Sequence, residues 1–311
     1  MSSGYDSPAT AVLAKWCGAT SAVTFVSGRA NFGPQSDSGS TIARHLDLAV
    51  ETFDRLMYRD RADFPEAEFL ATGAGGEDVV MCAFEEAFRN SCVLTGFLGD
   101  TLWERKHPSP WLSKDMQFKY PGGGSLSEFR LRVGFVHLPV PLMTLRSHES
   151  IYAISNSDEM KQWSTGQEGY DRPIARRIVE TAGVRRELFG QKKNAVTQPF
   201  YRAIGDGGML SPTSRRDLRL FWETGGEGLV SFRSIWLRVI NRWLVETGVA
   251  DRVRDRIRRT RWAPRFEPAF AALRRATADG AIFQWGVARS ISRLGAFTAD
   301  TAGDEGRSGL S

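Results

Sequence analysis

The feature that most restricts the fold is an alternation of apolar and helical segments near the start of the chain. The runs 22–26, 49–53 and 91–95 are apolar and five residues long, which is typical of buried strands. Between the first two, residues 41–48 carry apolar side chains at helical spacing behind a Ser/Asp cap. Strands that alternate with helices pair in parallel. The sequence therefore predicts an α/β fold with an open, mostly parallel sheet and helices on both of its faces.

Composition narrows the class of protein. Of the 311 residues, 41% are hydrophobic and 25% charged, as in an ordinary globular protein, and we find neither a signal peptide nor a transmembrane segment. The net charge of +5 suits an anionic ligand without requiring nucleic acid. The cysteines, Cys17, Cys82 and Cys92, lack disulfide or zinc-site spacing. We expect buried free thiols in a reducing cytoplasm.

A turn of small polar residues leads directly into a helical run at residues 9–15. The turn consists of Ser2, Ser3, Gly4, Tyr5, Asp6 and Ser7. A helix N-terminus carries partial positive charge and unpaired N–H groups, so it holds an anion without a basic side chain. Gly4 permits a strained backbone, and Ser2 and Ser7 add hydroxyl donors. The turn reads as a phosphate-binding loop, although a plain Ser/Asp helix cap explains it equally well.

A Gly-Asp segment follows the third predicted strand. Gly99 and Asp100 come after the carboxyl end of that strand, and Glu104 follows them. Ligands of open α/β sheets bind beyond the carboxyl ends of the strands. We therefore expect this segment to reach the same crevice as the phosphate-binding loop. The alternative is that Asp100 and Glu104 only cap a junction between loop and helix.

Two adjacent lysines follow a helix that the sequence predicts within residues 171–184. Asp171 and Pro173 are typical of its start, and Gly183 is typical of its end. Lys192 and Lys193 come shortly after this helix. A lysine ammonium contacts phosphate as a compact point charge, so either residue is a candidate phosphate ligand.

In order and spacing, the three segments resemble those of the PP-loop ATP pyrophosphatases, within the adenine nucleotide alpha hydrolase-like (HUP) superfamily. Within this family, the chain resembles the synthetase domain of asparagine synthetase. The family loop is Ser-Gly-Gly-X-Asp-Ser, and the matching residues here are Ser2, Gly4, Asp6 and Ser7. The family's Gly-(Asp/Glu)-Gly-X-Asp-Glu segment is matched by Gly99, Asp100 and Glu104. The resemblance covers residues 1 to about 200.

This resemblance implies an ATP-dependent adenylating ligase or transferase that requires magnesium. ATP would bind with its β- and γ-phosphates on the loop, magnesium would be held by Asp6 or Asp100, and Lys192 or Lys193 would steady the leaving pyrophosphate. A carboxylate or carbonyl oxygen of a small-molecule substrate would attack the α-phosphorus, and a nucleophile such as ammonia would complete the reaction. Nothing in the chain corresponds to a glutaminase domain, so ammonia would come free or from a separate donor.

Four departures from the family pattern keep a second interpretation open. Ser3 replaces a glycine of the loop, and Thr101 and Trp103 replace a glycine and an acid of the later segment. Only Met1 precedes the loop, whereas a buried strand precedes it in the family. Either the start is misassigned, the chain is a fragment, or the sheet lacks a strand. The alternative function is a catalytically degenerate protein that binds nucleotide or serves as a scaffold.

The sequence divides after the predicted nucleotide-binding domain of residues 1–205. Residues 206–228 are rich in Gly, Ser and Pro and predict a linker, 229–296 predict a helical appendage, and 297–311 predict a disordered tail. The arginine run at 252–261 follows a helix with a wide apolar face. Packing in a core is the interpretation we favour, ahead of nucleic acid or a membrane surface. A PP-loop enzyme that modifies tRNA is a further alternative.

Overall fold

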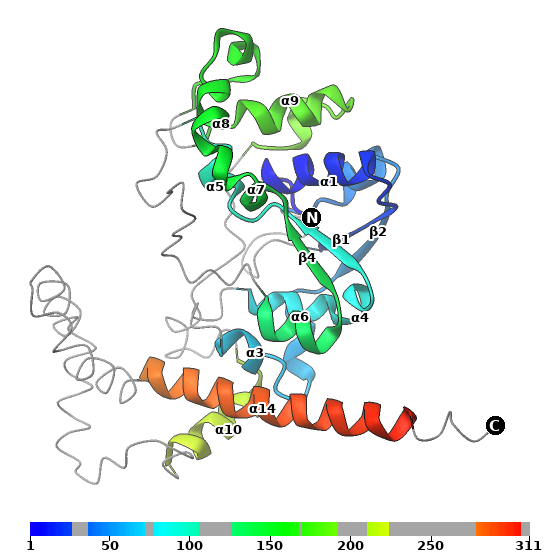
Figure 1. Ribbon diagram of the computed structural model, residues 1–311, viewed down its shortest axis with the longest axis vertical. Helices are drawn as coiled ribbons and strands as arrows, with labels where there is room; N and C mark the ends of the chain where they lie inside the picture. Colours follow the sequence, from blue (N-terminus) through cyan, green and yellow to red (C-terminus); the bar gives the residue numbers. More distant parts are fainter. Residues whose placement is uncertain are drawn as a thin grey trace, which may run out of the picture. The chain divides into compact units, whose positions relative to one another are not determined.

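The computed structural model describes residues 1–26, 37–71, 78–105, 126–167, 170–191, 210–223 and 278–305. It is a mixed α/β structure of short parallel strand pairs and many helices (Figure 1). The chain forms two compact units, each built from two segments. The first unit is Met1–Tyr58 with Val80–Gln198, and the second is Arg59–Val79 with Pro199–Ser311. The third crossing, between Gln198 and Pro199, lies near the boundary predicted at residue 205, whereas nothing in the sequence pattern singled out Arg59–Val79.

The first unit carries the strands. Its described helices and strands, in chain order, are α1 (Asp6–Trp16), β1 (Ser21–Phe25), α2 (Ser40–His45), β2 (Ala49–Phe53), α4 (Glu85–Phe88), β3 (Cys92–Thr95), α5 (Gly99–Leu102), α6 (Ser127–Val133), β4 (Val136–Pro139), α7 (Val140–Met143), α8 (His148–Ser155) and α9 (Pro173–Thr181). Short 3₁₀ helices stand between them at Leu145–Ser147, Asp158–Trp163 and Arg186–Leu188, and two more, Met57–Asp60 and Val79–Phe84, cross the boundaries between the units.

The strands form two parallel pairs. β1 pairs with β2 from Ser21↔Ala49 to Phe25↔Phe53, and β3 pairs with β4 from Cys92↔Val136 onward. The predicted parallel pairing is therefore present, but the described residues do not join these pairs into one open sheet. The three predicted strands are all found, but they are less buried than expected. No residue of β2 or β3 is buried, and β1 is buried only at Thr24 and Phe25.

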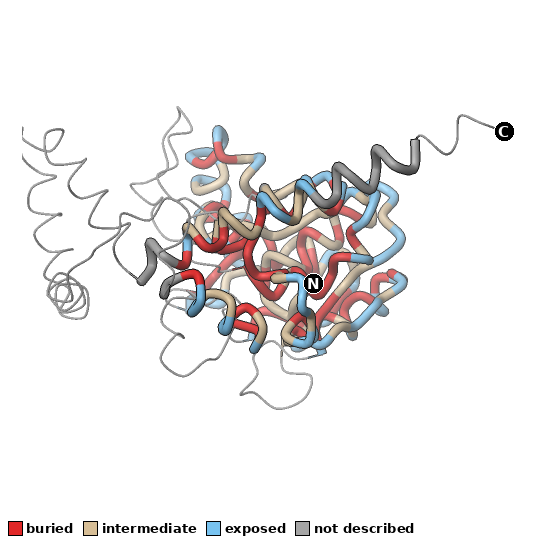
Figure 2. Tube along the Cα trace, turned by 90° about the horizontal axis from the view of Figure 1, so that it is seen from below, coloured by how far each residue is buried: buried red, intermediate tan, exposed pale blue. Residues whose placement is uncertain are grey.

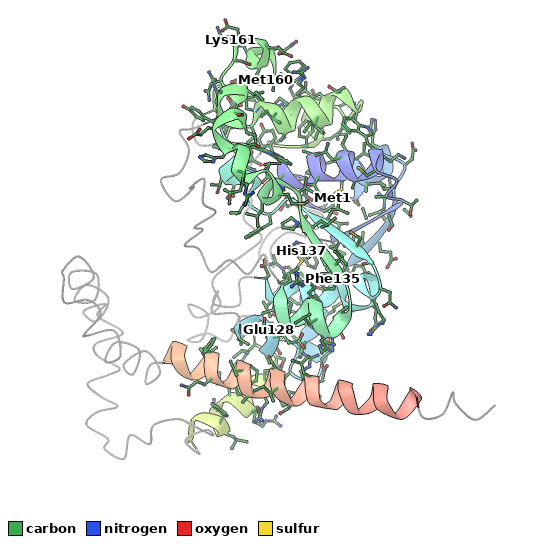
Figure 3. All side chains as sticks on the ribbon, viewed as in Figure 1. Met1, Glu128, Phe135, His137, Met160 and Lys161 are labelled. Atoms are coloured by element: carbon green, nitrogen blue, oxygen red, sulfur yellow. The ribbon has the colours of Figure 1, made fainter. Side chains whose placement is uncertain are left out.

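Met1 lies at the edge of β1 that faces away from β2. The main chains of Thr20 and Val26 are hydrogen-bonded to β2. Successive residues of a strand direct their main-chain groups to opposite edges, so the carbonyl of Val23 points to the other edge. The amino group of Met1 donates to this carbonyl, and Thr24 Oγ1 donates to the Met1 carbonyl at 2.6 Å. Figure 3 shows Met1 beneath α1, beside the strands. The residues before the loop are thus anchored to β1.

Helix α1 is the central helix of the first unit. It lies between α9 and the strands, and it contacts β3, α2 and α9 (Figure 1). Ala9 and Val12 on its inner face are buried in one apolar cluster with Ile42 of α2 and Val179 of α9. Burial of an aliphatic side chain contributes about 1.5–3 kcal/mol, so this packing fixes the position of the helix start. The loop that precedes α1 is held with it.

The three cysteines are free thiols, but two are not buried as expected. Cys82 is buried, whereas Cys17 and Cys92 are exposed. Cys92 is the first residue of β3, and at this position its side chain reaches solvent. No helix in the part of the chain that the structure describes is long and apolar enough to cross a bilayer.

The described helices of the second unit are α3 (Ala67–Leu70), α10 (Pro212–Glu223) and α14 (Ala278–Glu305). Helix α10 lies within the segment predicted to be a linker, and α14 continues into the predicted tail. The first turn of α10 is capped by the completely buried Glu66, which accepts bonds from the Ser211 N–H and, at 2.7 Å, from the Ser214 hydroxyl. Because Glu66 is 145 residues away from Ser211, no local pattern reveals this cap.

Helix α14 is joined to α10 and α3 by polar and close apolar contacts. Trp285 Nε1 donates to Asp217 of α10 at 2.7 Å, and Arg289 forms an ion pair with the same carboxylate. Between residues 282 and 295 of α14, buried positions recur at helical spacing, and exposed positions lie between them (Figure 2). The apolar face predicted at 229–244 and the arginine run at 252–261 lie outside the described residues.

Substituting Gly286 with alanine is expected to destabilise the second unit by about 2 kcal/mol, because overpacking forces the backbone apart. A Cβ at this position would lie 2.9 Å from the Ala67 carbonyl oxygen of α3. Gly295→Ala on the same helix is the matched control, since a Cβ there meets nothing within 4 Å. It is expected to be neutral or to stabilise by about 0.5–1 kcal/mol. Urea unfolding followed by circular dichroism measures both, and equal effects would contradict the close approach of α3 and α14.

Candidate functional site

The candidate site begins at the loop that runs into α1. The Ser2 N–H donates to Ser7 Oγ at 3.0 Å, and the Gly190 N–H donates to the Ser3 carbonyl at 2.8 Å. Helix α1 has Tyr5 at its N-cap and no side-chain cap bond. The plain Ser/Asp cap is therefore not what the structure contains. The first turn of α1 retains main-chain N–H groups that a helix leaves without intrahelical partners.

Asp37 lies against the same loop. Its carboxylate accepts the Ser3 N–H at 3.2 Å and the Ser3 hydroxyl at 2.9 Å. The Asp37 carboxylate is an anion that belongs to the protein itself, and it accepts the hydrogen bonds that a bound phosphate would otherwise accept. An anionic ligand that used the Ser3 donors would have to replace it.

The segment after β3 packs directly on the start of α1. A Cβ at Gly96 would lie 2.7 Å from the main chain of Asp6, and a Cβ at Gly99 would lie 2.4 Å from Asp6 Cγ. Real Cβ atoms do not approach so closely, so only glycine fits at either position. The structure thus brings Gly99 and the predicted loop together at one place, as the strand order suggested.

Arg172 completes the site, and sequence reasoning missed it. One of its terminal nitrogens, Nη1, donates to Asp6 Oδ2, and its Nε lies 3.6 Å from Glu104 Oε2. The residue is only 3% exposed. Its guanidinium lies 5.2 Å from the ring centroid of Tyr170 and 5.8 Å from that of Tyr5. The available signal was its position directly before Pro173 at the start of α9, where the chain turns toward the loop.

The carboxyl of Asp6 has an unusual environment. Its pKa is raised to about 6, chiefly by burial; the charge of Arg172 lowers this pKa, and the charges of Asp100 and Glu104 raise it. Asp6 Oδ1 is buried and has no hydrogen-bond partner among the described residues. Asp100 itself is exposed, and Glu104 is partly buried. Three carboxylates therefore act on one guanidinium.

Glu104 also holds the main chain that carries Arg172. Its Oε1 accepts the N–H of Asp171 at 3.2 Å and the N–H of Arg105 at 3.1 Å. The buried Asp171 carboxylate in turn accepts bonds from the Ser164 hydroxyl and the Gly166 N–H. This clamp fixes the chain immediately before α9. Glu104 thus combines a structural contact with its place beside Arg172.

Tyr5, a predicted site residue, and Trp103, which replaces a family acid, both have buried side chains that face the core. Tyr5 is completely buried, receives a hydrogen bond from Arg176 and packs on Phe189, so its side chain is not available to a ligand. Trp103, which occupies the position of a family acid, is buried in the main apolar cluster. The sequence placed Tyr5 among the cofactor-binding residues because it lies within the loop. Its aromatic ring is used instead to anchor the loop.

Lys192 and Lys193 lie outside the described residues. The last described residue before them is Gln191, which follows Gly190, and Gly190 is bonded to the loop. For magnesium, the unpartnered Asp6 Oδ1 and the nearby Asp100 are suitable oxygen ligands. The described residues hold no cluster of three or more His, Cys, Asp or Glu side chains that would bind a metal by themselves. The donor set fits a magnesium ion that takes its remaining ligands from phosphate and water.

Comparison with known proteins does not assign the chain to a family. No protein-family model matches the chain, and no curated protein or solved structure shows significant similarity to it.

Proposed function

We propose that the first unit is a PP-loop nucleotide-binding domain that cleaves ATP to AMP and pyrophosphate in order to activate a carboxylate or carbonyl substrate. The observation that supports this most is the close packing of the Gly96–Glu104 segment on Asp6 at the start of α1. It gathers carboxylates, a guanidinium and helix N–H groups around one point. The strand pairs would belong to the open parallel sheet of this fold.

In this proposal, the N–H groups of the loop and of the first turn of α1 bind the β- and γ-phosphates. Lys192 or Lys193 contacts the leaving pyrophosphate as a point charge. Magnesium, held by Asp6 and Asp100, neutralises negative charge on the phosphates when it is bound. A substrate oxygen attacks the α-phosphorus, the bond to the oxygen that bridges the α- and β-phosphates breaks, and pyrophosphate leaves. The protein supplies position and electrostatics rather than a covalent intermediate.

The adenylated substrate then reacts with a nucleophile such as ammonia, free or from a separate donor protein, and AMP leaves. We place this reaction in the cytoplasm, where free thiols such as that of Cys92 remain reduced. A small molecule is the proposed acceptor.

A second candidate is a nucleotide-binding scaffold without catalysis. Two observations favour it: Asp37 already occupies the Ser3 donors, and Trp103 puts an apolar core side chain where the family has an acid. The two functions differ in turnover rather than in nucleotide binding.

Pyrophosphate release from ATP and magnesium tests the proposal, with a panel of carboxylate substrates and ammonia supplied. We expect release by the unmodified chain and a loss of about a hundredfold or more in Asp6→Ala and in the double variant Lys192→Ala, Lys193→Ala. Asp47→Ala, which removes a 91% exposed carboxylate in the same unit, is the control and should retain activity. Undiminished release by Asp6→Ala would refute the proposal. Nucleotide binding without release, measured by calorimetry, would favour the scaffold.

A further inference from the structure

Arg172 lies immediately before α9, on a main chain that its neighbours hold in place. The Asp171 N–H is bonded to Glu104, Pro173 begins α9, and the Arg172 carbonyl accepts the Arg176 N–H at 3.0 Å. Both sides of Arg172 are therefore fixed by the fold. A buried guanidinium on a fixed main chain has few positions, and here it is directed at the first residue of α1.

In the ion pair of Asp6 and Arg172, each side chain has one polar atom without a hydrogen-bond partner. Asp6 Oδ1 is buried without a hydrogen-bond partner, and so is Arg172 Nε, whose nearest carboxylate oxygen, on Glu104, is 3.6 Å away. The unused oxygen can accept only a cation or a hydrogen-bond donor, and the unused nitrogen can donate only to an acceptor. A ligand that carries both signs, a metal–phosphate complex, satisfies both atoms at once.

The charges around Asp6 and Arg172 also favour a ligand that contains both a metal and a phosphate. Asp100 and Glu104 lie near Asp6 together with Arg172, and within the described part of the chain no second guanidinium is paired with these three carboxylates. The rings of Tyr5 and Tyr170 hold the guanidinium plane in place. A planar, fixed guanidinium is suited to bidentate contact with phosphate.

We propose that Arg172 is a phosphate-binding residue positioned beside Asp6: its positive charge weakens the binding of a divalent cation at Asp6 alone, and its guanidinium binds the phosphate that arrives with the cation. This deepens the proposed function, on which it rests for the identity of the ligand as a metal–nucleotide complex. It requires only that the ligand contain a divalent metal and a phosphate group. Release of pyrophosphate is not part of it.

The test uses the full chain, with Mn²⁺ as the metal probe and inorganic pyrophosphate as the phosphate probe. Without phosphate, Arg172→Gln is expected to bind Mn²⁺ about tenfold more tightly than the unmodified chain, because a positive charge beside Asp6 is removed. Adding Asp6→Asn to that variant should abolish the gain. With Mn²⁺ saturating, Arg172→Gln should bind pyrophosphate about tenfold more weakly, since a charge-assisted contact is lost.

Arg172→Lys serves as the second variant and remains informative if Arg172→Gln fails to fold by circular dichroism. It keeps the charge beside Asp6 and loses the planar fork. Its Mn²⁺ affinity is expected to stay within about twofold of the unmodified value, while its pyrophosphate affinity falls. Unchanged pyrophosphate affinity in Arg172→Lys, or unchanged Mn²⁺ affinity in a folded Arg172→Gln, would overturn the proposal. If the expected binding changes occur in a chain that releases no pyrophosphate from ATP, this inference stands and the proposed reaction fails.

Discussion

The variant Gly190→Ala is expected to lose about 3 kcal/mol of unfolding free energy, because it combines backbone strain with a steric clash. Gly190 has a φ of +65°, and a Cβ there would lie 2.4 Å from the ring of Tyr5. The ring cannot easily withdraw, since it is in contact with Arg176 and Phe189. The Gly190 N–H also holds the Ser3 carbonyl, so we expect pyrophosphate binding at the loop to weaken in the same variant.

Gly166 offers a closely matched control. Its φ is +66°, and a Cβ there meets nothing within 4 Å. Gly166→Ala therefore introduces the backbone strain alone, with an expected loss of about 1 kcal/mol. Urea unfolding of both variants separates strain from contact. Equal losses would show that the contact between Gly190 and Tyr5 does not constrain the fold.

The second large effect is a dependence of stability on pH that arises at Asp6. Burial raises the pKa of the folded carboxyl to about 6, against an ordinary value of 3.8. The folded state therefore binds more protons than the unfolded chain between these values, and the stabilising contribution is lost as the pH rises through 6. A shift of about two pH units corresponds to about 3 kcal/mol. Without metal or nucleotide, the protein should lose this stability between pH 4 and 7.

Asp6→Asn isolates that contribution, because asparagine does not titrate. Urea unfolding at several pH values, with a chelator present, gives the unfolding free energy of each protein. The difference between the unmodified chain and Asp6→Asn should change by about 3 kcal/mol from pH 4 to pH 7, in the direction that favours the variant at high pH. A difference that stays constant with pH would mean that Asp6 is not desolvated in the folded protein. Carboxylates that do not lie near Asp6 affect both proteins alike.

The elements of the first unit were largely predictable from local sequence. The strands at Ser21–Phe25 and Ala49–Phe53 and helix α9 lie close to their predicted positions, and their parallel pairing followed from the alternation. Such predictions succeed because apolar periodicity and capping residues act within a few positions of one another. The approach of the Gly99 segment to the loop followed from the same alternation, since ligand sites gather at the carboxyl ends of strands.

The functional surroundings of the loop were much less predictable. Arg172 meets Asp6 across 166 residues of sequence, and Glu66 caps α10 across 145. The burial of Tyr5 depends on Arg176 and Gly190, neither of which is near it in the chain. Neither apolar periodicity nor a local motif indicates which distant side chains will pack together in the folded protein. Such contacts arise only when packing brings the elements together.

By itself, the sequence determined the class of the fold, the order of strands and helices, and the small polar turn at the start of α1, because short-range spacing of apolar, capping and glycine residues is enough for these. Only the tertiary structure decided that Arg172 is the cation beside Asp6, that Tyr5 anchors the loop from within, and that Arg59–Val79 belongs to the second unit. The physical reason is that charge pairing and burial depend on neighbours in space, which the chain acquires only on folding.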